Sequence, residues 1–382
     1  MSAPTLVGRE KELAQLDTLL DETAREGFRV LAVGGEPGIG KTSLLDRLAD
    51  RGDEEGWLVL RGSAAEFETE LPLAPVIDCF DAYLQALDPR SAKRFDEDTL
   101  AELAGIFPGL SSYRERSASP IVSSERFRSY HAIRKLVEDL GTRQNLLVVL
   151  DDCQWADQAS LELISHLMRR PPDAPVLVAA GYRANRIHPV MEADLNAGVK
   201  RGLVMRIDVE PLGPEDSHTL SGADTAAERE RLYSETGGNP FYILELAKAM
   251  DGAQPAPNSM VPPAVGAAIS SEIASVSDRA KSFLDAAAVG GDPFDIDLAG
   301  TISGLADDDA IDALDELDRA GIIRATEIPR RFAFRHPLIR NAVYESTPAG
   351  ARLRLHEGAA KALAGTGAPA IELAKHLSLI HI

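Results

Sequence analysis

Between two apolar segments of the chain stands Gly35-Glu36-Pro37-Gly38-Ile39-Gly40-Lys41-Thr42. The apolar residues 30–33 before it predict a strand, and the apolar positions on one face of residues 44–49 predict a helix. In a loop of the pattern G-x-x-x-x-G-K-S/T, glycines let backbone N–H groups form a concave nest that favours phosphate at the helix N-terminus. We therefore interpret these eight residues and Ser43 as a phosphate-binding loop, in preference to a glycine-rich turn without a ligand.

Two side chains of this loop have distinct expected roles in binding a nucleotide. Lys41 would reach the β- and γ-phosphates, and the Thr42 hydroxyl would bind Mg²⁺. An acidic pair, Asp151-Asp152, follows the apolar residues 146–150, which predict a strand buried on both faces. Because ligands bind at the carboxyl ends of parallel strands, we predict Asp151 as a Mg²⁺ ligand and Asp152 as the group that orients water. The alternative is that this acidic pair caps the helix expected a few residues later.

Three more residues near predicted element ends are candidates for the site. Arg183 follows the strand predicted over 175–180, so it would lie at the same sheet edge and contact the γ-phosphate, unless it is a surface arginine. His336 precedes a predicted helix, where capping or packing is the alternative to a ligand role. Cys153 has no histidine near it in the sequence, so we predict a small buried residue and not a nucleophile.

The composition limits the classes of protein to which the chain can belong. Its 382 residues suffice for two or three domains of about 150 residues each, and 45% apolar residues allow a large core. Sixty acidic against 40 basic residues give a formal charge of −20, which disfavours general nucleic-acid binding. Cys79 and Cys153 show no pairing pattern, and no apolar run approaches the roughly 18 residues of a membrane span. We expect a cytoplasmic protein without membrane contact.

Residues 1–210 alternate between predicted strands and helices, which is typical of an α/β domain with a parallel sheet between layers of helices. The predicted strands are 28–33, 57–61, 145–150, 175–180 and 203–209. The predicted helices are 11–24, 123–140 and 158–170. Together with the phosphate loop, this order predicts the core of a P-loop NTPase.

The rest of the chain is predicted to be mostly helical. Residues 211–250 read as a helical cap, and the Pro- and Gly-rich residues 251–263 read as a linker. Residues 264–348 combine helices with a hairpin over 322–334, which fits a winged-helix-like domain. Residues 349–382 would begin a helical, TPR-like region that is truncated, with helices over 352–363 and 371–377. The final residues 378–382 do not read as a native helix end.

Basic residues gather near the predicted hairpin: Arg330, Arg331, Arg335, Arg340, Arg352 and Arg354. Such a group can form a DNA-binding wing. The acidic balance of the chain and the interleaved apolar positions favour internal contacts or a solvated face instead.

Several motifs occur in the order found in one family. They are Leu6-Val7-Gly8-Arg9-Glu10, the phosphate loop, Leu150-Asp151-Asp152-Cys153-Gln154-Trp155-Ala156-Asp157, Gly181-Tyr182-Arg183, Thr236-Gly237-Gly238-Asn239-Pro240-Phe241 and Phe334-Arg335-His336-Pro337-Leu338-Ile339. The chain thus resembles the STAND class of AAA-related P-loop NTPases, in particular the N-terminal part of large ATP-binding regulators of the LuxR type. The resemblance spans about residues 5–350.

This resemblance implies roles that the residues alone do not. Val7, Gly8 and Arg9 would line the adenine side of the pocket. Asn239 and Pro240 would lie near the nucleotide in the helical cap. His336 would contact the β-phosphate of bound ADP and hold a closed resting state.

The expected function is a slow ATPase used as a signal-transduction switch, with ATP or ADP and Mg²⁺ as ligands and with Lys41, Asp152 and Arg183 as catalytic groups. An inducer would act through C-terminal repeats and DNA would bind through a further domain, both of which we expect to be missing here, while the ATP state would self-associate. One alternative is a nucleotide-binding scaffold attached to a kinase or cyclase signalling protein. A less favoured one is a P-loop kinase of small molecules, for which no acceptor motif stands out.

Overall fold

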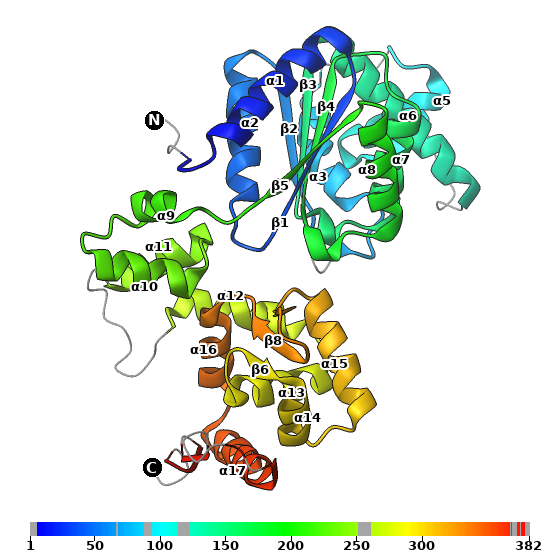
Figure 1. The fold of residues 1–382 in the computed structure, drawn as a ribbon. Coiled ribbons are helices and arrows are strands. Elements are labelled where there is room, and N and C mark those ends of the chain that lie inside the picture. Colours follow the sequence, from blue (N-terminus) through cyan, green and yellow to red (C-terminus); the bar gives the residue numbers. More distant parts are fainter. Residues whose placement is uncertain are drawn as a thin grey trace. The chain divides into compact units, whose positions relative to one another are not determined.

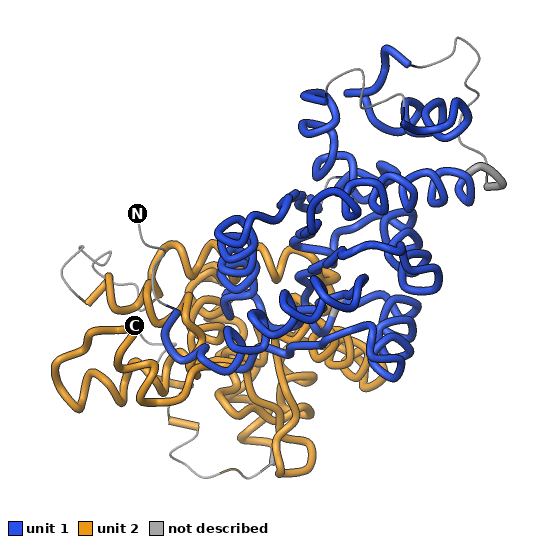
Figure 2. Tube along the Cα trace, turned by 90° about the horizontal axis from the view of Figure 1, so that it is seen from above, with its two compact units in different colours: residues 1–210 blue, residues 211–382 orange. Residues whose placement is uncertain are grey.

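The computed structural model describes residues 6–65, 68–87, 94–113, 123–250, 261–366, 368, 373–374 and 376–378. The chain divides into two compact units, residues 1–210 and residues 211–382, which Figure 2 shows in blue and orange. Residues 251–260 of the predicted linker lie outside the described residues, as do residues 371, 372 and 375 of the helix predicted over 371–377.

Unit 1 is built on a five-stranded parallel sheet (Figure 1). The strand order is β2-β3-β4-β1-β5, and every neighbouring pair is parallel. The strands are β1 (Arg29–Gly35), β2 (Leu58–Ser63), β3 (Leu146–Asp151), β4 (Val176–Arg183) and β5 (Val204–Val209). The predicted α/β fold with a parallel sheet between helices is therefore confirmed, and each predicted strand is present with ends that shift by a few residues.

Helices cover both faces of this sheet because alternate strand residues point to opposite sides. Leu31 and Val33 of β1 share a core with α1 (Glu10–Glu26) and α2 (Lys41–Glu54). Val30 and Ala32 face the other core, which contains the remaining helices of the unit. Those helices are α3 (Ala74–Gln85), α5 (Glu97–Ile106), α6 (Ser123–Arg143), α7 (Gln158–Arg169) and α8 (Pro189–Lys200), together with the short turns η2 (Pro108–Tyr113), η3 (Cys153–Trp155) and η4 (Ala184–Arg186).

Unit 2 is helical with one small antiparallel sheet of order β6-β8-β7. Its first helices are α9 (Pro214–Ser221), α10 (Ala226–Thr236) and α11 (Pro240–Met250). Its later elements are α12 (Pro263–Ala274), α13 (Asp278–Gly290), β6 (Phe294–Asp295), α14 (Ile296–Ser303), α15 (Asp307–Arg319), β7 (Ile323–Ala325), β8 (Arg331–Phe334), α16 (Pro337–Ser346) and α17 (Ala349–Thr366). The predicted hairpin is present as β7 and β8, and its assignment to a winged-helix domain stays a prediction.

Arginines near this hairpin make contacts within unit 2. Arg330 and Arg331 pair with acidic residues at the start of α14. The guanidinium of Arg335 donates to the Glu272 carboxylate at 3.0 Å, and both side chains are buried. Arg340 Nε donates to a backbone carbonyl of α13 at 3.0 Å. These pairings agree with internal contacts rather than with a DNA-binding wing.

No helix among the described residues has both the length and the apolar character that crossing a membrane requires.

Candidate nucleotide-binding site

The predicted phosphate loop joins the end of β1 to the start of α2. Gly40, in a left-handed conformation with φ of 104°, is the N-cap of α2, and no side chain caps this helix. Because glycine offers no capping side chain, this helix N-terminus is a favourable position for an anion. Lys41 is only 7% exposed, and its Nζ donates to Gly35 O at 3.1 Å and to Glu36 O at 2.8 Å. Its ammonium group thus lies against the loop itself.

Asp151 at the end of β3 is in direct contact with this loop. It shares the strand parity of Leu147 and Val149, which face the core of α1 and α2. Accordingly, Thr42 Oγ1 donates to Asp151 Oδ2 at 2.6 Å. A hydroxyl and a carboxylate are hard oxygen donors of the kind that Mg²⁺ takes from proteins beside phosphate oxygens. The pair fits the predicted metal site.

Gly181 of β4 makes room for this carboxylate. A Cβ at position 181 would lie 2.5 Å from Asp151 Oδ1 and 2.9 Å from a methyl carbon of Leu45. Any side chain there would push Asp151 or α2 aside. In the sequence Gly181 is only part of a family motif, because its contact with Asp151 depends on β4 lying next to β3.

Asp152 and Arg183 are connected through one side chain. Gln154 Nε2 donates to Asp152 Oδ1 at 2.7 Å, and Gln154 Oε1 accepts from the backbone N–H of Arg183 at 3.1 Å. The Arg183 guanidinium carbon lies 5.9 Å from the centroid of the Trp155 ring. The sequence indicates Gln154 and Trp155 only as part of a family motif, and the structure gives them these contacts at the carboxyl edge of the sheet.

The helix after the acidic pair is capped by a different residue. Asp157, which is 4% exposed, accepts from Ala159 N at 2.9 Å and Ser160 N at 3.1 Å, and also from Leu73 N at 2.9 Å. Neither Asp151 nor Asp152 is therefore needed to cap α7, and the capping alternative for that pair is wrong.

Cys153 is unsuited to act as a nucleophile. Its Sγ contacts Leu150 O at 3.4 Å, and the residue is buried. Burial, followed by the negative charges of Asp151 and Asp152, raises the pKa of the Cys153 thiol to about 12. The thiol stays protonated near neutral pH, which agrees with the prediction.

The residues before α1 lie beside the phosphate loop. Val7 and Gly8 form a turn, and Arg9 is the N-cap residue of α1. The Arg9 guanidinium is buried, donates to Ile39 O at 3.1 Å and lies 3.5 Å from a Glu12 carboxylate oxygen. The structure thus brings the turn and the loop together.

Three predicted site residues belong to unit 2. Pro240 begins α11, and the buried Asn239 accepts a hydrogen bond from Phe241 N at 3.1 Å. His336, 4% exposed, precedes α16 but does not cap it with its side chain. Its ring stands edge-on to Tyr242 of α11, with centroids 5.4 Å apart.

Gly237, two residues before Asn239, is pressed against the same histidine. A Cβ at position 237 would lie 2.4 Å from His336 Nδ1, and the φ of Gly237 is 58°. Both the close approach and the left-handed backbone require glycine here. The turn between α10 and α11 and the start of α16 are therefore packed together through His336.

A parallel sheet, a glycine-rich loop that leads from β1 into α2, and an acidic strand end beside that loop have the arrangement of a P-loop nucleotide-binding domain. Residues 5–179 match the family model described as "AAA ATPase domain". This segment of unit 1 is therefore similar to AAA ATPase domains.

Solved structures with a related fold are only distantly similar. A variant of RuvB from Thermotoga maritima is 14% identical, with 86% of this chain and 92% of that chain covered and a TM-score of 0.37. Cdc6p from Pyrobaculum aerophilum is 17% identical, with 91% and 97% covered and a TM-score of 0.42. A structure of the replication initiator DnaA bound to AMPPCP and single-stranded DNA is 10% identical, with 82% and 89% covered and a TM-score of 0.41. A search of curated proteins finds no match. Similarity this low transfers no function to the chain.

Proposed function

We propose that unit 1 binds ATP with Mg²⁺ and hydrolyses it slowly, and that the bound nucleotide switches a cytoplasmic transcriptional regulator of the LuxR type. The observation that carries the proposal is the 2.6 Å hydrogen bond from Thr42 to Asp151. It joins the two segments that must meet for a metal-bound triphosphate to be held. The family match of residues 5–179 supports the nucleotide-binding part.

The residues at the carboxyl edge of the sheet lie in positions that allow distinct roles in nucleotide binding and hydrolysis. Lys41 would turn from the loop carbonyls toward the β- and γ-phosphates, which offer a stronger acceptor for its ammonium group. Thr42 and Asp151 would hold Mg²⁺, which when bound offsets phosphate charge. Asp152 would orient the attacking water while Gln154 fixes its carboxylate, and Arg183 would contact the γ-phosphate.

The regulatory part of the proposal rests on unit 2 and on the family resemblance. His336 packs against the Gly237 turn, so that the segment carrying Asn239 and Pro240 and the start of α16 form one cluster. We propose that ADP holds this cluster in a resting state, and that ATP together with an inducer permits self-association. The region around β7 and β8 would serve as a winged-helix-like module.

Calorimetric titration with ATP and Mg²⁺, together with a phosphate-release assay, tests the catalytic part. Lys41→Ala should abolish ATP binding, whereas Asp152→Asn should bind ATP and lose turnover. Lys11→Ala and Asp173→Asn, at exposed positions outside the site, are matched controls that should behave as the unaltered chain. Normal ATP affinity in Lys41→Ala would refute the site, and normal turnover in Asp152→Asn would refute the role of that carboxylate.

The switch is tested by the rate of ADP release and by sedimentation with ADP or ATP. His336→Ala should release ADP faster and self-associate more readily, while His218→Ala on α9 should not. Equal ADP release rates for His336→Ala and the unaltered chain would exclude the proposed resting contact.

A further inference from the structure

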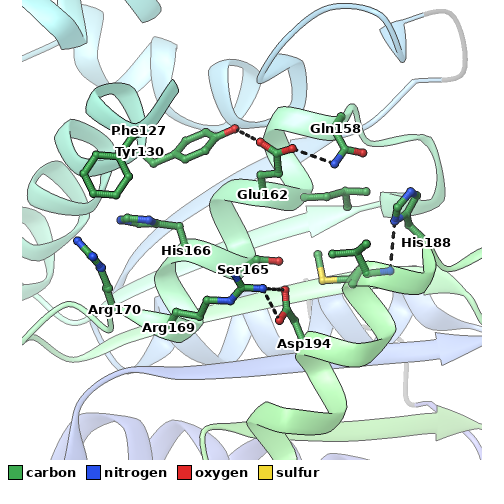
Figure 3. Close-up of a pocket in the computed structure, with 13 residues that line it drawn as sticks. Phe127, Tyr130, Gln158, Glu162, Ser165, His166, Arg169, Arg170, His188 and Asp194 are labelled. Carbon is green, nitrogen blue, oxygen red and sulfur yellow. Dashed lines mark hydrogen bonds and ion pairs between the residues drawn. The ribbon is translucent and has the colours of Figure 1, made fainter. Parts of the chain in front are cut away.

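A groove of about 460 Å³ lies on unit 1 between α6, α7 and the start of α8 (Figure 3). None of the residues assigned above to the nucleotide lines it. Its volume falls within the roughly 300–1,000 Å³ that is usual for small-molecule sites. Phe127 of α6 and Val190 of α8 line it and are 53% and 52% exposed. A ligand that covers these two apolar side chains would remove apolar surface from water, which favours binding.

The carboxylates that line the groove already have partners. Glu162 accepts from the Tyr130 hydroxyl at 2.7 Å and from Gln158 Nε2 at 2.9 Å. Asp194 accepts two hydrogen bonds from Arg169, at 2.8 and 2.9 Å. Figure 3 shows these pairs along the groove. A cationic ligand would therefore have to break existing bonds to find a counter-charge.

The opposite charge is available at the Phe127 end of the groove. The exposed Arg170 stands over the Phe127 ring, with its guanidinium carbon 5.1 Å from the ring centroid. Among the residues that the structure describes, no carboxylate pairs with this guanidinium. This guanidinium beside the exposed Phe127 ring can therefore pair with an anionic ligand.

A second polar group at this end also lacks a partner. His166 Nε2 is buried and makes no hydrogen bond, while its ring stands edge-on to Phe127 with centroids 5.7 Å apart. Burial, followed by the positive charges of Arg170 and Arg134, lowers the pKa of His166. The neutral imidazole can still donate through Nε2–H, and a buried polar atom without a partner is destabilising until one is supplied.

We propose that this groove binds a small aromatic carboxylate. Arg170 donates to the carboxylate, His166 Nε2 donates to the same group, and the aromatic body packs against Phe127 and Tyr130. A neutral ligand would leave the guanidinium unpaired, and a cation would meet no free acid. The site is separate from the phosphate loop, so its occupation does not require the nucleotide function proposed above.

Calorimetric titration of the full chain with naphthoate, indoleacetate and benzoate tests this proposal, with the neutral naphthamide as the ligand control. At least one acid should bind, and naphthamide should bind more weakly than naphthoate. Arg170→Gln should weaken binding about tenfold or more, because a hydrogen bond to a charged group is lost. Arg170→Lys should retain part of the affinity, and Phe127→Ala should lose affinity for every acid.

Arg128→Gln is the matched control, because it removes the same charge from an α6 side chain that is 70% exposed outside the groove. It should leave binding unchanged. The proposal is overturned if none of the three acids binds at millimolar concentration, if naphthamide binds as well as naphthoate, or if Arg128→Gln and Arg170→Gln weaken binding equally. It is also overturned if Arg170→Gln dissociates an oligomer without changing acid binding, since the groove would then be a contact between copies.

Discussion

The phosphate-loop edge of unit 1 and the His336 cluster of unit 2 are built in different ways. At the loop, polar groups from strand ends, the start of α2 and η3 meet through hydrogen bonds, such as those of Thr42 with Asp151 and of Gln154 with Asp152 and Arg183. Around His336, a histidine ring packs on Gly237 and Tyr242 with little room to move. The first arrangement suits binding of charge, and the second suits transmission of a change in backbone position.

The two regions share one feature, which is a glycine that leaves no room for a Cβ beside a side chain with a proposed role. Gly181 touches Asp151 and Gly237 touches His336. Substituting each glycine therefore separates an effect on ligand binding from an effect on packing, and matched glycines elsewhere in the chain serve as controls.

Gly181→Ala should have the largest effect. Its Cβ would lie 2.5 Å from Asp151 Oδ1, so the carboxylate must move. We expect about tenfold or greater loss of affinity for ATP with Mg²⁺ and destabilisation of unit 1 by roughly 1–3 kcal/mol. Gly105→Ala in α5, where nothing lies within 4 Å of the added Cβ, should leave binding intact. Chemical unfolding and ATP titration measure both effects, and unchanged ATP affinity in Gly181→Ala would contradict the assigned role of Asp151.

Gly237→Ala should have a smaller effect, which is measured on the stability of unit 2. Strain at a φ of 58° and overlap with His336 should together cost roughly 2 kcal/mol. Gly222→Ala, with a φ of 66° and open space around its Cβ, measures the strain alone. Combining Gly237→Ala with His336→Ala should recover the overlap part of the cost, because the two residues are in contact. Strictly additive unfolding free energies would show that this contact carries no energy.

Acidification should have the smallest effect and should distinguish the two units. Burial lowers the pKa of His166 in unit 1, so the unfolded state binds more protons below about pH 6.5 and unit 1 loses stability as the pH falls. Burial raises the pKa of Asp285 and Asp292 in unit 2. As the pH falls through these raised pKa values, both carboxyl groups become protonated in the folded state, and the free-energy cost of burying their negative charge disappears. His166→Gln should make unfolding of unit 1 less sensitive to pH between 7 and 5.5, and an unchanged pH dependence would show that His166 is not the responsible group.

Much of the fold could be predicted because its signals are local. The doubly buried run of β3 and the phosphate loop predict a parallel sheet, and strand parity is enough to direct Asp151 toward α2. The helix α3 was not predicted, because its N-cap residue Leu73 offers no capping side chain. The two-residue strand β6 is too short to leave a pattern.

The rest of the site depends on contacts between distant segments. Gln154 reaches Arg183 only because β4 lies beside β3, an order that the sequence does not state. His336 lies against Gly237, which is far from it in the sequence, and the proposed role of this histidine rests on the resemblance to a family.

The central claim is that Thr42 and Asp151 hold a metal for a nucleotide bound by the phosphate loop. Calorimetric titration with ATP, with and without Mg²⁺, tests it in the unaltered chain and in Asp151→Asn. The account predicts that Mg²⁺ strengthens ATP binding in the unaltered chain and that this gain disappears in Asp151→Asn. An equal gain from Mg²⁺ in both proteins would contradict it.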